Sequence, residues 1–376
     1  MGRRRVIGVA IDIAWPGKHH QATVRGILEA ARERGWRCVL DPFLEKTAGY
    51  DGVIARATRP VADRLRRARL PAVNVWVNSP DRTLPRVVPD QAAAGRLAAD
   101  HLKARGFRRF AFLGHPRDLN TTLHGAGFRE VVEASGFPCS VRLVRQEPRS
   151  GAEWRAMQAS LHDWISEWVF PCGVFVADDF SARLLADVCR RKGLRLPDDV
   201  ALVGFGNEEL TCEMMEPTLT SIEQGFERVG RRAVDHLARL LRGAAPRERV
   251  ELVPPAGIVE RASTDVFAVD DRDVARALRT IADLSSRPLR VPAVVAAVGT
   301  ARRSLERRFR KSLGRTIHDQ IVRAHVERAK RLLAGTDEPL KRVARESGFR
   351  TPQQLSKLFR RSEGTTPLAF RRRSRG

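Results

Sequence analysis

The sequence of 376 residues contains few cysteines, few aromatic side chains and no long apolar run. Its cysteines are odd in number and at least 17 residues apart: Cys38, Cys139, Cys172, Cys189 and Cys212. This spacing argues against both a CxxC metal site and a disulfide framework. We therefore expect reduced, buried thiols.

The first apolar run, residues 6–11, is far shorter than the core of a signal peptide or a membrane span. The sequence therefore predicts a cytoplasmic protein with no membrane partner.

Motifs for catalysis are also missing. Gly17-Lys18 is followed by His19, so no phosphate-binding G-x-x-x-x-G-K-[ST] is completed, and neither G-x-G-x-x-G after a strand nor G-x-S-x-G occurs. His318 and His325 lie seven apart on a predicted helix, a spacing more typical of core or surface histidines than of metal ligands. We expect no enzyme, no metal and no cofactor.

Acidic residues are scarce: 68 Lys and Arg face 44 Asp and Glu, a net charge of +24 with pI ≈ 11.3. Residues 270–376 hold 27 of the basic residues and 11 of the acidic ones, so two-thirds of the excess lies in the last third of the chain. Such an excess predicts a polyanionic partner, bound by a C-terminal module.

Before residue 270, short apolar runs alternate with amphipathic segments. The predicted strands are 6–11, 37–40, 52–55, 72–77, 110–113, 141–144, 173–177, 201–205, 250–255 and 257–263. The predicted helices are 21–34, 61–69, 92–105, 125–135, 154–168 and 182–192. Apolar strands between amphipathic helices predict parallel sheets covered on both faces, with a ligand site at the carboxyl ends of the strands.

The C-terminal part contains an internal duplication. An offset of 50 residues repeats the pattern L-x-x-x-F-R-x-S-x-G-x-T, which begins at Leu305 and again at Leu355. Leu and Phe four apart share a helix face, and the following Gly is typical of a helix C-terminus. The opposite, outward faces carry cationic and amide side chains suited to phosphates and base edges. The candidate DNA contacts are Arg302, Arg303, Arg307, Arg310, Lys311, Arg350, Gln353, Gln354, Lys357, Arg360 and Arg361.

A short apolar helix and a glycine turn precede each copy, at Gly299 and Gly348. This spacing predicts helix-turn-helix units at about 290–314 and 340–364. A cationic face on a single helix is usually just solvated, but two copies in register favour DNA binding. The second copy has Thr351 as N-cap with Gln354 closing a capping box, whereas Ala301 occupies that place in the first, so Thr300 is expected to cap there. Residues 317–333 are expected to form a spacer helix between the units.

The segments "VGTARRSLERRFRKSLGRTI", "RAKRLL" and "GFRTPQQLSKLFRRSEGTTPLAFR" within residues 272–373 resemble the paired helix-turn-helix domain of the AraC/XylS family. The resemblance implies that one helix of each unit enters successive major grooves, and that the protein activates transcription, with RNA polymerase as a further partner.

Residues 4–262, with "VVPDQAAAGRLAADHLKARGFRRFAFLG", "GVFVADDFSARLL" and "RLPDDVALVGFGNEELTCEMMEPTLTSIEQ", resemble the sugar-binding core of LacI/GalR-type regulators. The resemblance implies a periplasmic-binding-protein fold of two lobes with a sugar-like effector, such as a pentose, between them. It carries Asp179, Asn207 and Glu208 over as ligand contacts. His124 stands where the family often has Arg, and Gly206 where it usually has Asp, so a different ligand, or none, is the alternative.

Further polar and aromatic candidates lie near predicted strand ends: Asp12, Trp15, His20, Gln21, Trp76 and Asn78. For each of them a surface or structural role is the alternative. Asp178-Asp179 could equally be the N-cap of the following helix.

These observations predict an α/β two-lobed periplasmic-binding-protein-like sensor domain, residues 1–268. It is followed by an all-α domain with two helix-turn-helix units, residues 269–376. The expected function is a homodimeric transcription regulator that binds a double-stranded DNA operator under control of a small molecule. A secreted solute-binding protein would not need the basic tail, and an RNA-binding protein would expose aromatic side chains that the tail lacks.

Overall fold

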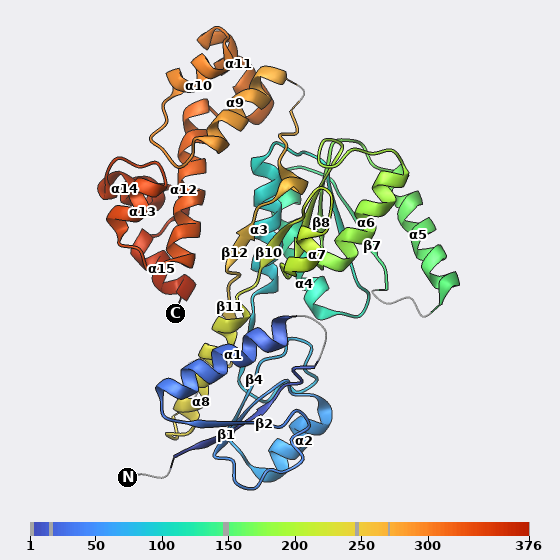
Figure 1. Cartoon of the computed structure of the whole chain (residues 1–376), viewed down its shortest axis with the longest axis vertical. Coiled ribbons are helices and arrows are strands. Elements are labelled where there is room, and N and C mark those ends of the chain that lie inside the picture. Colours follow the sequence, from blue (N-terminus) through green and yellow to red (C-terminus); the bar gives the residue numbers. More distant parts are fainter. Residues whose placement is uncertain (1–3, 15–17, 146–149, 245–247, 270, 376) are drawn as a thin grey trace. The chain divides into compact units, whose positions relative to one another are not determined.

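The computed structural model describes residues 4–14, 18–145, 150–244, 248–269 and 271–375 (Figure 1). Its residues form two compact units. The first unit comprises Met1–Ala94, His115–Gly127 and Glu223–Pro255, and the second comprises Gly95–Gly114, Phe128–Ile222 and Ala256–Gly376.

The first unit is built on a six-stranded sheet of order β11-β5-β4-β3-β1-β2, with parallel neighbours throughout. Its strands are β1 (Val6–Ala10), β2 (Arg37–Leu40), β3 (Gly52–Ala55), β4 (Ala72–Asn74), β5 (Arg86–Pro89) and β11 (Val250–Val253). The central strands are buried along their length, as parallel strands covered on both faces must be.

Helices cover both faces of this sheet. They are α1 (Lys18–Glu33), α2 (Arg59–Ala68) and α8 (Phe226–Leu240). Ile27 of α1 and Val234 of α8 share a core with Ile7 and Val9 of β1. On the other face, Val61 and Leu65 of α2 pack with Ala10 and Val53. Successive strand residues therefore point to opposite faces of the sheet, where they form two separate apolar cores.

The helices α1 and α8 touch through glycines. A Cβ on Gly26 would lie 1.9 Å from the Glu227 carbonyl oxygen, and one on Gly230 would lie 2.1 Å from that of Thr23. The backbones approach so closely that neither position accepts a side chain.

The second unit contains a six-stranded sheet of order β12-β10-β9-β8-β6-β7. Its strands are β6 (Phe110–Gly114), β7 (Cys139–Leu143), β8 (Cys172–Val176), β9 (Val200–Phe205), β10 (Thr220–Glu223) and β12 (Gly257–Val259). The helices around it are α3 (Gln91–Ala104), α4 (Leu119–Glu133), α5 (Gly151–Ser166), α6 (Asp179–Arg191), α7 (Glu209–Glu213) and the 3₁₀ turn η1 (Ala262–Thr264). Trp164 of α5 and Leu185 of α6 bury one face, while Phe128 of α4 packs against Phe112 and Phe175 on the other.

The remainder of the second unit is a chain of helices. They are α9 (Arg272–Asp283), α10 (Val291–Val298), α11 (Arg302–Leu313), α12 (Ile317–Gly335), α13 (Leu340–Glu346), α14 (Pro352–Glu363) and α15 (Pro367–Arg375). No strand occurs among the described residues after 270, as the sequence predicts.

The predicted fold class is confirmed, with local differences. The predicted strand 72–77 ends at Asn74, and β5, β10 and α8 had no counterpart among the predicted elements. The two returning strands enter different sheets, β11 in the first unit and β12 in the second.

All five cysteines are free; Cys172, Cys189 and Cys212 are buried, and Cys38 and Cys139 half-buried. The described residues include no cluster of three or more His, Cys, Asp or Glu side chains fit to hold a metal ion. Within the same residues, no helix combines the length and apolarity that crossing a membrane requires.

Candidate functional site

Helices α10 and α11 form a helix-turn-helix with a fully buried apolar side. Leu305 and Phe309 of α11 are 0% exposed and share a core with Val294 and Val298 of α10. Because residues four apart occupy one helix face, the opposite face of α11 is left to solvent.

The solvent face of α11 is cationic. Each contact residue predicted on this helix is exposed: Arg302, Arg303, Arg307, Arg310 and Lys311. Arg302 makes an ion pair with Glu306 at 2.9 Å. The five basic residues line a depression of about 750 Å³, together with Thr316 and His318 at the start of α12. The structure thus presents a concave, positive surface along this helix.

Helices α13 and α14 repeat the arrangement. Leu355 and Phe359 are 0% exposed and pack with Val343 and Ala344 of α13. The candidate contacts at this unit are all exposed: Arg350, Gln353, Gln354, Lys357, Arg360 and Arg361. The duplication in the sequence is therefore a duplication of structure, with the same face buried in both copies.

The turn between α13 and α14 packs against a histidine. Gly348 has a φ of 78°, and a Cβ there would lie 2.5 Å from Nε2 of His325 on α12. Burial lowers the pKa of His325 to about 4, so the ring is neutral at physiological pH. His325 is a core residue, one of the two roles that its spacing predicted.

The recognition helix α14 is capped. Thr351 Oγ1 accepts from the Gln354 amide nitrogen at 3.1 Å, as predicted for the N-cap. The Gln354 side-chain oxygen, however, accepts at 3.0 Å from the amide of Arg350, one residue before the position that closes a capping box. The amide group of Gln354 is therefore partly committed to the fold.

Helix α11 begins without such a cap. Its N-cap is Ala301, and no side chain makes a capping hydrogen bond there. The expectation that Thr300 caps this helix is wrong, because the chain enters the helix one residue later.

One arginine of α11 has a structural role. Arg308, which was not among the candidate contacts, donates to Asp271 at 3.1 Å and to Asp273 at 2.5 Å. Asp271 is also the N-cap of α9. Arg308 thereby fastens α11 to α9 and leaves its neighbours to face solvent.

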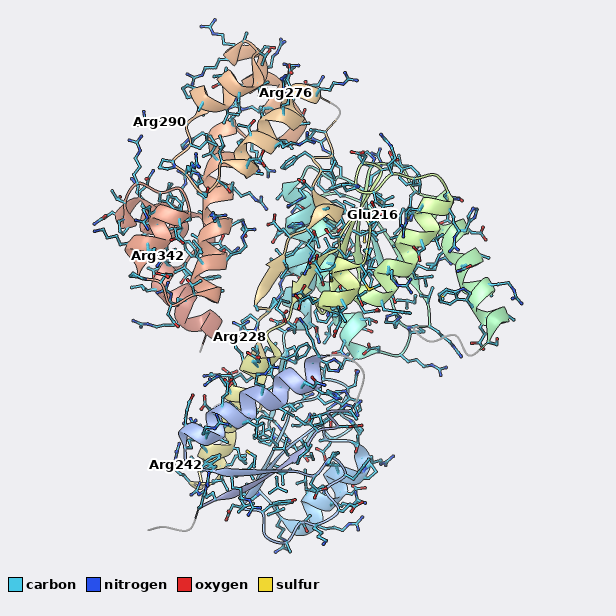
Figure 2. The ribbon with its side chains drawn as sticks, in the orientation of Figure 1. Glu216, Arg228, Arg242, Arg276, Arg290 and Arg342 are labelled. Atoms are coloured by element: carbon cyan, nitrogen blue, oxygen red, sulfur yellow. The ribbon has the colours of Figure 1, made fainter. Side chains whose placement is uncertain are left out.

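Helix α12 connects the two helix-turn-helix motifs. Thr316 and Asp319 form a complete capping box at its start, and Lys330 near its end pairs with Glu363 of α14 at 3.1 Å. The helix packs against α9, α14 and α15. Other cations of this region, Arg276, Arg290 and Arg342, are also exposed (Figure 2).

In the first unit, polar side chains gather where β1 ends. His20 Nδ1 lies 2.6 Å from the Asp12 carbonyl oxygen, so it donates, and Nε2 is left as an acceptor. Asp12 Oδ1 accepts from the Ala14 amide at 2.9 Å. Burial, followed by the charges of His20 and Arg56, lowers the pKa of His19 to about 4.

The next strands add a stacked pair. The Arg56 guanidinium, directly after β3, lies 3.8 Å from the ring centroid of Trp76, which follows β4. Burial lowers the pKa of Arg56 and the Asp12 carboxylate opposes this shift. Asp12, His20 and Trp76 thus lie at the carboxyl edge of one sheet, where parallel α/β sheets bind ligands.

His124 is held by a residue that the sequence analysis did not select. Its Nε2 lies 2.6 Å from Oε1 of Gln91, whose Nε2 donates to Asn120 at 2.9 Å. Gln91 follows β5, the strand that was missed, and only that strand would have placed it at the sheet edge. His124 and Gln91 are both nearly fully buried.

In the second unit, Asp179 is 1% exposed and both carboxylate oxygens are engaged. Oδ1 accepts from the Ser221 hydroxyl at 2.6 Å, and Oδ2 from the Glu208 amide at 2.8 Å. Burial raises the pKa of Asp179 to about 6, against the effect of these hydrogen bonds. Its neighbour Asp178 is the N-cap of α6, accepting from the Ser181 amide at 2.8 Å.

The loop after β9 brings Asn207 and Glu208 beside Asp179. Asn207 adopts a φ of 49° and its amide donates to the Ser221 hydroxyl at 3.0 Å. At Gly206, a Cβ would lie 3.5 Å from Asp179 Oδ2. A carboxylate at this position would face the Asp179 carboxylate, and Gly206 supplies none.

Three other candidates have different surroundings. Gln21 is exposed, with its amide 3.5 Å from the Ile13 carbonyl oxygen. Asn78 donates to Asp118 at 2.8 Å and accepts from the Leu119 amide, holding the start of α4. Trp15 lies outside the described residues.

Gln224 is a polar residue that the sequence analysis did not single out. It is 0% exposed, and neither side-chain atom has a hydrogen-bond partner among the described residues. It lies one residue after β10, between Glu223, which pairs with Lys18 at 2.7 Å, and the start of α8. Buried amides normally have partners, so Gln224 is an additional candidate ligand contact.

Two protein families match this chain. The periplasmic binding protein-like domain matches residues 99–264, and the helix-turn-helix domain matches residues 294–373. The first range contains the second sheet, and the second range contains α11, α13, α14 and most of α10.

Individual proteins match over much greater lengths. The xylose operon regulatory protein of Escherichia coli strain K12 is 31% identical over 290 residues, 76% of this chain and 73% of that protein. The protein of the same name from Haemophilus influenzae is 28% identical over 89% of this chain and 91% of its own. A solved structure described as the xylose-binding transcription activator xylR covers 98% of both chains with 27% identity and a TM-score of 0.62.

The two-sheet α/β region and the duplicated helix-turn-helix define a DNA-binding transcription regulator with a periplasmic-binding-protein-like sensor. Within that class, the chain belongs to the family of the xylose operon regulatory proteins, regulators of the AraC/XylS type.

Proposed function

We propose that this regulator activates transcription from an operator that α11 and α14 bind in the major groove. The observation that carries the proposal is the pair of exposed cationic faces on two equivalent helices, each backed by the same buried Leu and Phe. Arginine and lysine bind phosphates and guanine edges, and glutamine binds adenine edges. The eleven exposed side chains named above are the proposed DNA contacts.

The proposed effector is a sugar-like small molecule, with a pentose as the first candidate. Support comes from the polar side chains at the carboxyl edges of the sheets and from the similar protein described as xylose-binding. Asp12, His20, Trp76, His124, Gln91 and Gln224 are proposed contacts in the first unit. Asn207 and Glu208 are proposed contacts in the second.

The roles of two candidates change within this proposal. Asp179 has both oxygens engaged by Ser221 and Glu208, so we assign it to positioning the loop that carries Asn207. Gln21 is exposed, so we leave it out of the proposed contacts.

A second candidate is a sensor that binds a ligand other than a neutral sugar. The observation that favours it is the chemistry at two positions: His124 is already bonded to Gln91, and Gly206 offers no carboxylate to a hydroxyl. Both features remove bidentate partners of sugar hydroxyls.

The domain boundary, the location and a further partner complete the proposal. We place the sensor at residues 1–268 and the DNA-binding domain at 269–376, because Ala268 still donates to the Arg105 carbonyl oxygen at 2.9 Å while α9 begins at Arg272. The chain acts in the cytoplasm without a catalytic step, with RNA polymerase as a partner.

A homodimer is proposed from an exposed apolar face. Leu210 of α7 is 78% exposed, and Met214, one turn later, is 82% exposed. In a single chain both apolar side chains therefore contact water. Light scattering of the wild type and of Leu210→Glu tests this: a dimer that becomes a monomer supports it, and an unchanged mass overturns it.

The effector is tested by thermal unfolding of the full chain with D-xylose, L-arabinose, D-ribose, D-glucose, gluconate and ribose 5-phosphate. A ligand at 100 times its Kd adds about 2.7 kcal/mol to the stability. Stabilisation by a pentose that Trp76→Ala abolishes supports the first candidate, with Trp36→Phe as the control. Stabilisation by an acid or phosphate alone supports the second, and no response to any compound contradicts both.

A further inference from the structure

The surplus charge of the first 269 residues is concentrated in one short stretch. These residues hold 41 Lys and Arg against 33 Asp and Glu, a surplus of eight. Residues 56–86 alone hold eight arginines and two aspartates, a surplus of six. The stretch contains α2, which carries four of these eight arginines.

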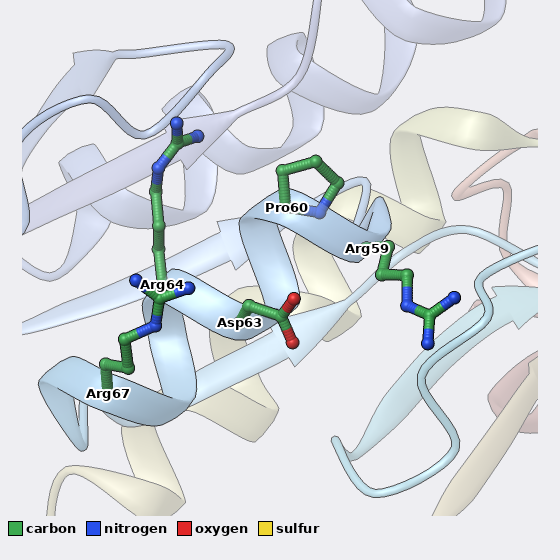
Figure 3. Close-up of a pocket in the computed structure, with 5 residues that line it drawn as sticks. All are labelled: Arg59, Pro60, Asp63, Arg64 and Arg67. Atoms are coloured by element: carbon green, nitrogen blue, oxygen red, sulfur yellow. The ribbon is translucent and has the colours of Figure 1, made fainter.

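Helix α2 separates its apolar and cationic residues. Val61, Ala62 and Leu65 are buried in the sheet core, whereas Arg59, Arg64, Arg66, Arg67 and Arg69 are exposed. The name α2 arginine face is used here for Arg59, Arg64 and Arg67, which line one open depression of about 560 Å³ with Pro60 and Asp63 (Figure 3).

Acidic residues do not neutralise this face. Both aspartates of the stretch bind Arg66: Asp63 at 3.1 Å and Asp81 at 3.0 Å. Arg64 donates to the Phe43 carbonyl oxygen at 2.6 Å, which leaves its charge uncompensated. Arg59 and Arg67 have no carboxylate within 4.0 Å among the described residues.

The spacing of the face suits a row of phosphates. Figure 3 shows Arg59 and Arg67 toward opposite ends of the helix, with Asp63 between them. Eight residues of helix span about 12 Å. One strand of B-DNA presents a phosphate every 3.4 Å of axis, so roughly three phosphates fall within that length.

Other occupants fit less well. An open depression cannot bury most of a small molecule's surface, as ligand sites do. A second copy of the same face would meet it with like charge, which disfavours a symmetric contact. DNA supplies opposite charge, and this protein binds DNA.

We propose that the α2 arginine face binds the phosphate backbone of DNA outside the segment contacted by α11 and α14. The contact adds affinity without base specificity, because phosphates carry no sequence information. The proposal rests on the DNA-binding function and extends it to the sensor part of the chain.

The test uses the full chain and two duplexes that share one selected operator, about 30 and about 100 base pairs long. Affinity is measured by fluorescence anisotropy across a series of KCl concentrations. Each phosphate contact adds about 0.9 to the slope of log K against log salt. We expect the wild type to have a slope steeper by about 2 on the long duplex.

The variant Arg59→Gln/Arg67→Gln keeps the Arg64 bond to Phe43 and should lose that extra slope while binding the short duplex as the wild type does. The matched control Arg25→Gln/Arg32→Gln removes equal charge from exposed positions of α1 and should keep it. Thermal unfolding checks that both variants fold.

Equal slopes on the two duplexes for the wild type, or an unchanged slope in the α2 variant, overturn the proposal. An unchanged slope with reduced activation in a purified transcription assay overturns it in favour of an acidic protein partner. If instead the proposed operator binding by α11 and α14 is wrong, the wild type will not bind the short duplex.

Discussion

His101 Nε2 lies 3.0 Å from Oγ1 of Thr264, and this contact joins α3 to the segment that leads into the helical region. Arg105 donates to His101 Nδ1 at 3.0 Å and to the Thr264 carbonyl oxygen at 2.6 Å. Since arginine only donates, Nδ1 accepts and Nε2 carries the proton. Burial and the Arg105 charge hold the pKa of His101 well below its usual range.

Replacement of His101 by alanine should therefore destabilise the protein. The change leaves a cavity and removes the acceptor of a buried arginine, which together cost about 2–3 kcal/mol. Urea unfolding measures the loss, with the exposed His162→Ala as control. Equal free energies of unfolding for the two variants would show that the His101 contacts do not stabilise the fold.

The unequal caps of the two recognition helices predict opposite effects. Ala301→Ser supplies the missing acceptor at α11 and should raise the free energy of unfolding by about 0.5–1 kcal/mol. Thr351→Ala removes the acceptor of the Gln354 amide and should lower it by about 1 kcal/mol. Thermal unfolding of both variants checks the signs, and a destabilising Ala301→Ser would contradict the assignment of the N-cap.

Asp179 should make stability depend on pH. Its pKa of about 6 in the folded protein exceeds the ordinary 3.8, so the native state holds the proton more tightly than the unfolded chain. Its contribution is therefore complete below about pH 4 and is lost as the pH rises through 6. Relative to Asp179→Asn, the wild type should lose stability from pH 4 to 6 and change little above 7.

The exposed Asp163→Asn is the control for that titration, since its carboxyl is 80% exposed. A stability difference between wild type and Asp179→Asn that stays constant with pH would contradict the raised pKa.

The contact of α1 with α8 predicts a severe effect of a single methyl group. Gly26→Ala places a Cβ against the Glu227 carbonyl oxygen and should cost about 3 kcal/mol, because backbone must move. Gly136→Asn, at a left-handed turn with open space, should cost far less. Chemical unfolding compares them, and a neutral Gly26→Ala would contradict the close approach.

The parts of the structure that follow from local patterns were predictable. Leu305 and Phe309 are four residues apart, so both lie on the buried face of one helix. The same spacing recurs 50 residues later. Strand β5 was missed because four residues ending in Pro89 carry little pattern of their own, and with it the position of Gln91.

Features that depend on distant residues were not predictable. Arg308 pairs with Asp271 and Asp273, and Asp179 bonds Ser221, across long stretches of the chain. The burial of Gln224 likewise depends on the packing of the folded chain. For Asp179, residue type alone suggested a ligand contact as readily as a structural role.

The central claim is that α11 and α14 bind the operator through their exposed faces. The most direct measurement is the affinity of the full chain for a selected operator after Arg307, Arg310, Lys357 and Arg360 are changed to Gln. Each contact contributes about 1 kcal/mol or more, so the four changes together should lower the affinity by roughly a thousandfold. The control with Arg276, Arg279, Arg287 and Arg290 changed to Gln removes equal charge elsewhere in the helical region and should bind nearly as the wild type. Unchanged operator affinity in the first variant would contradict the account.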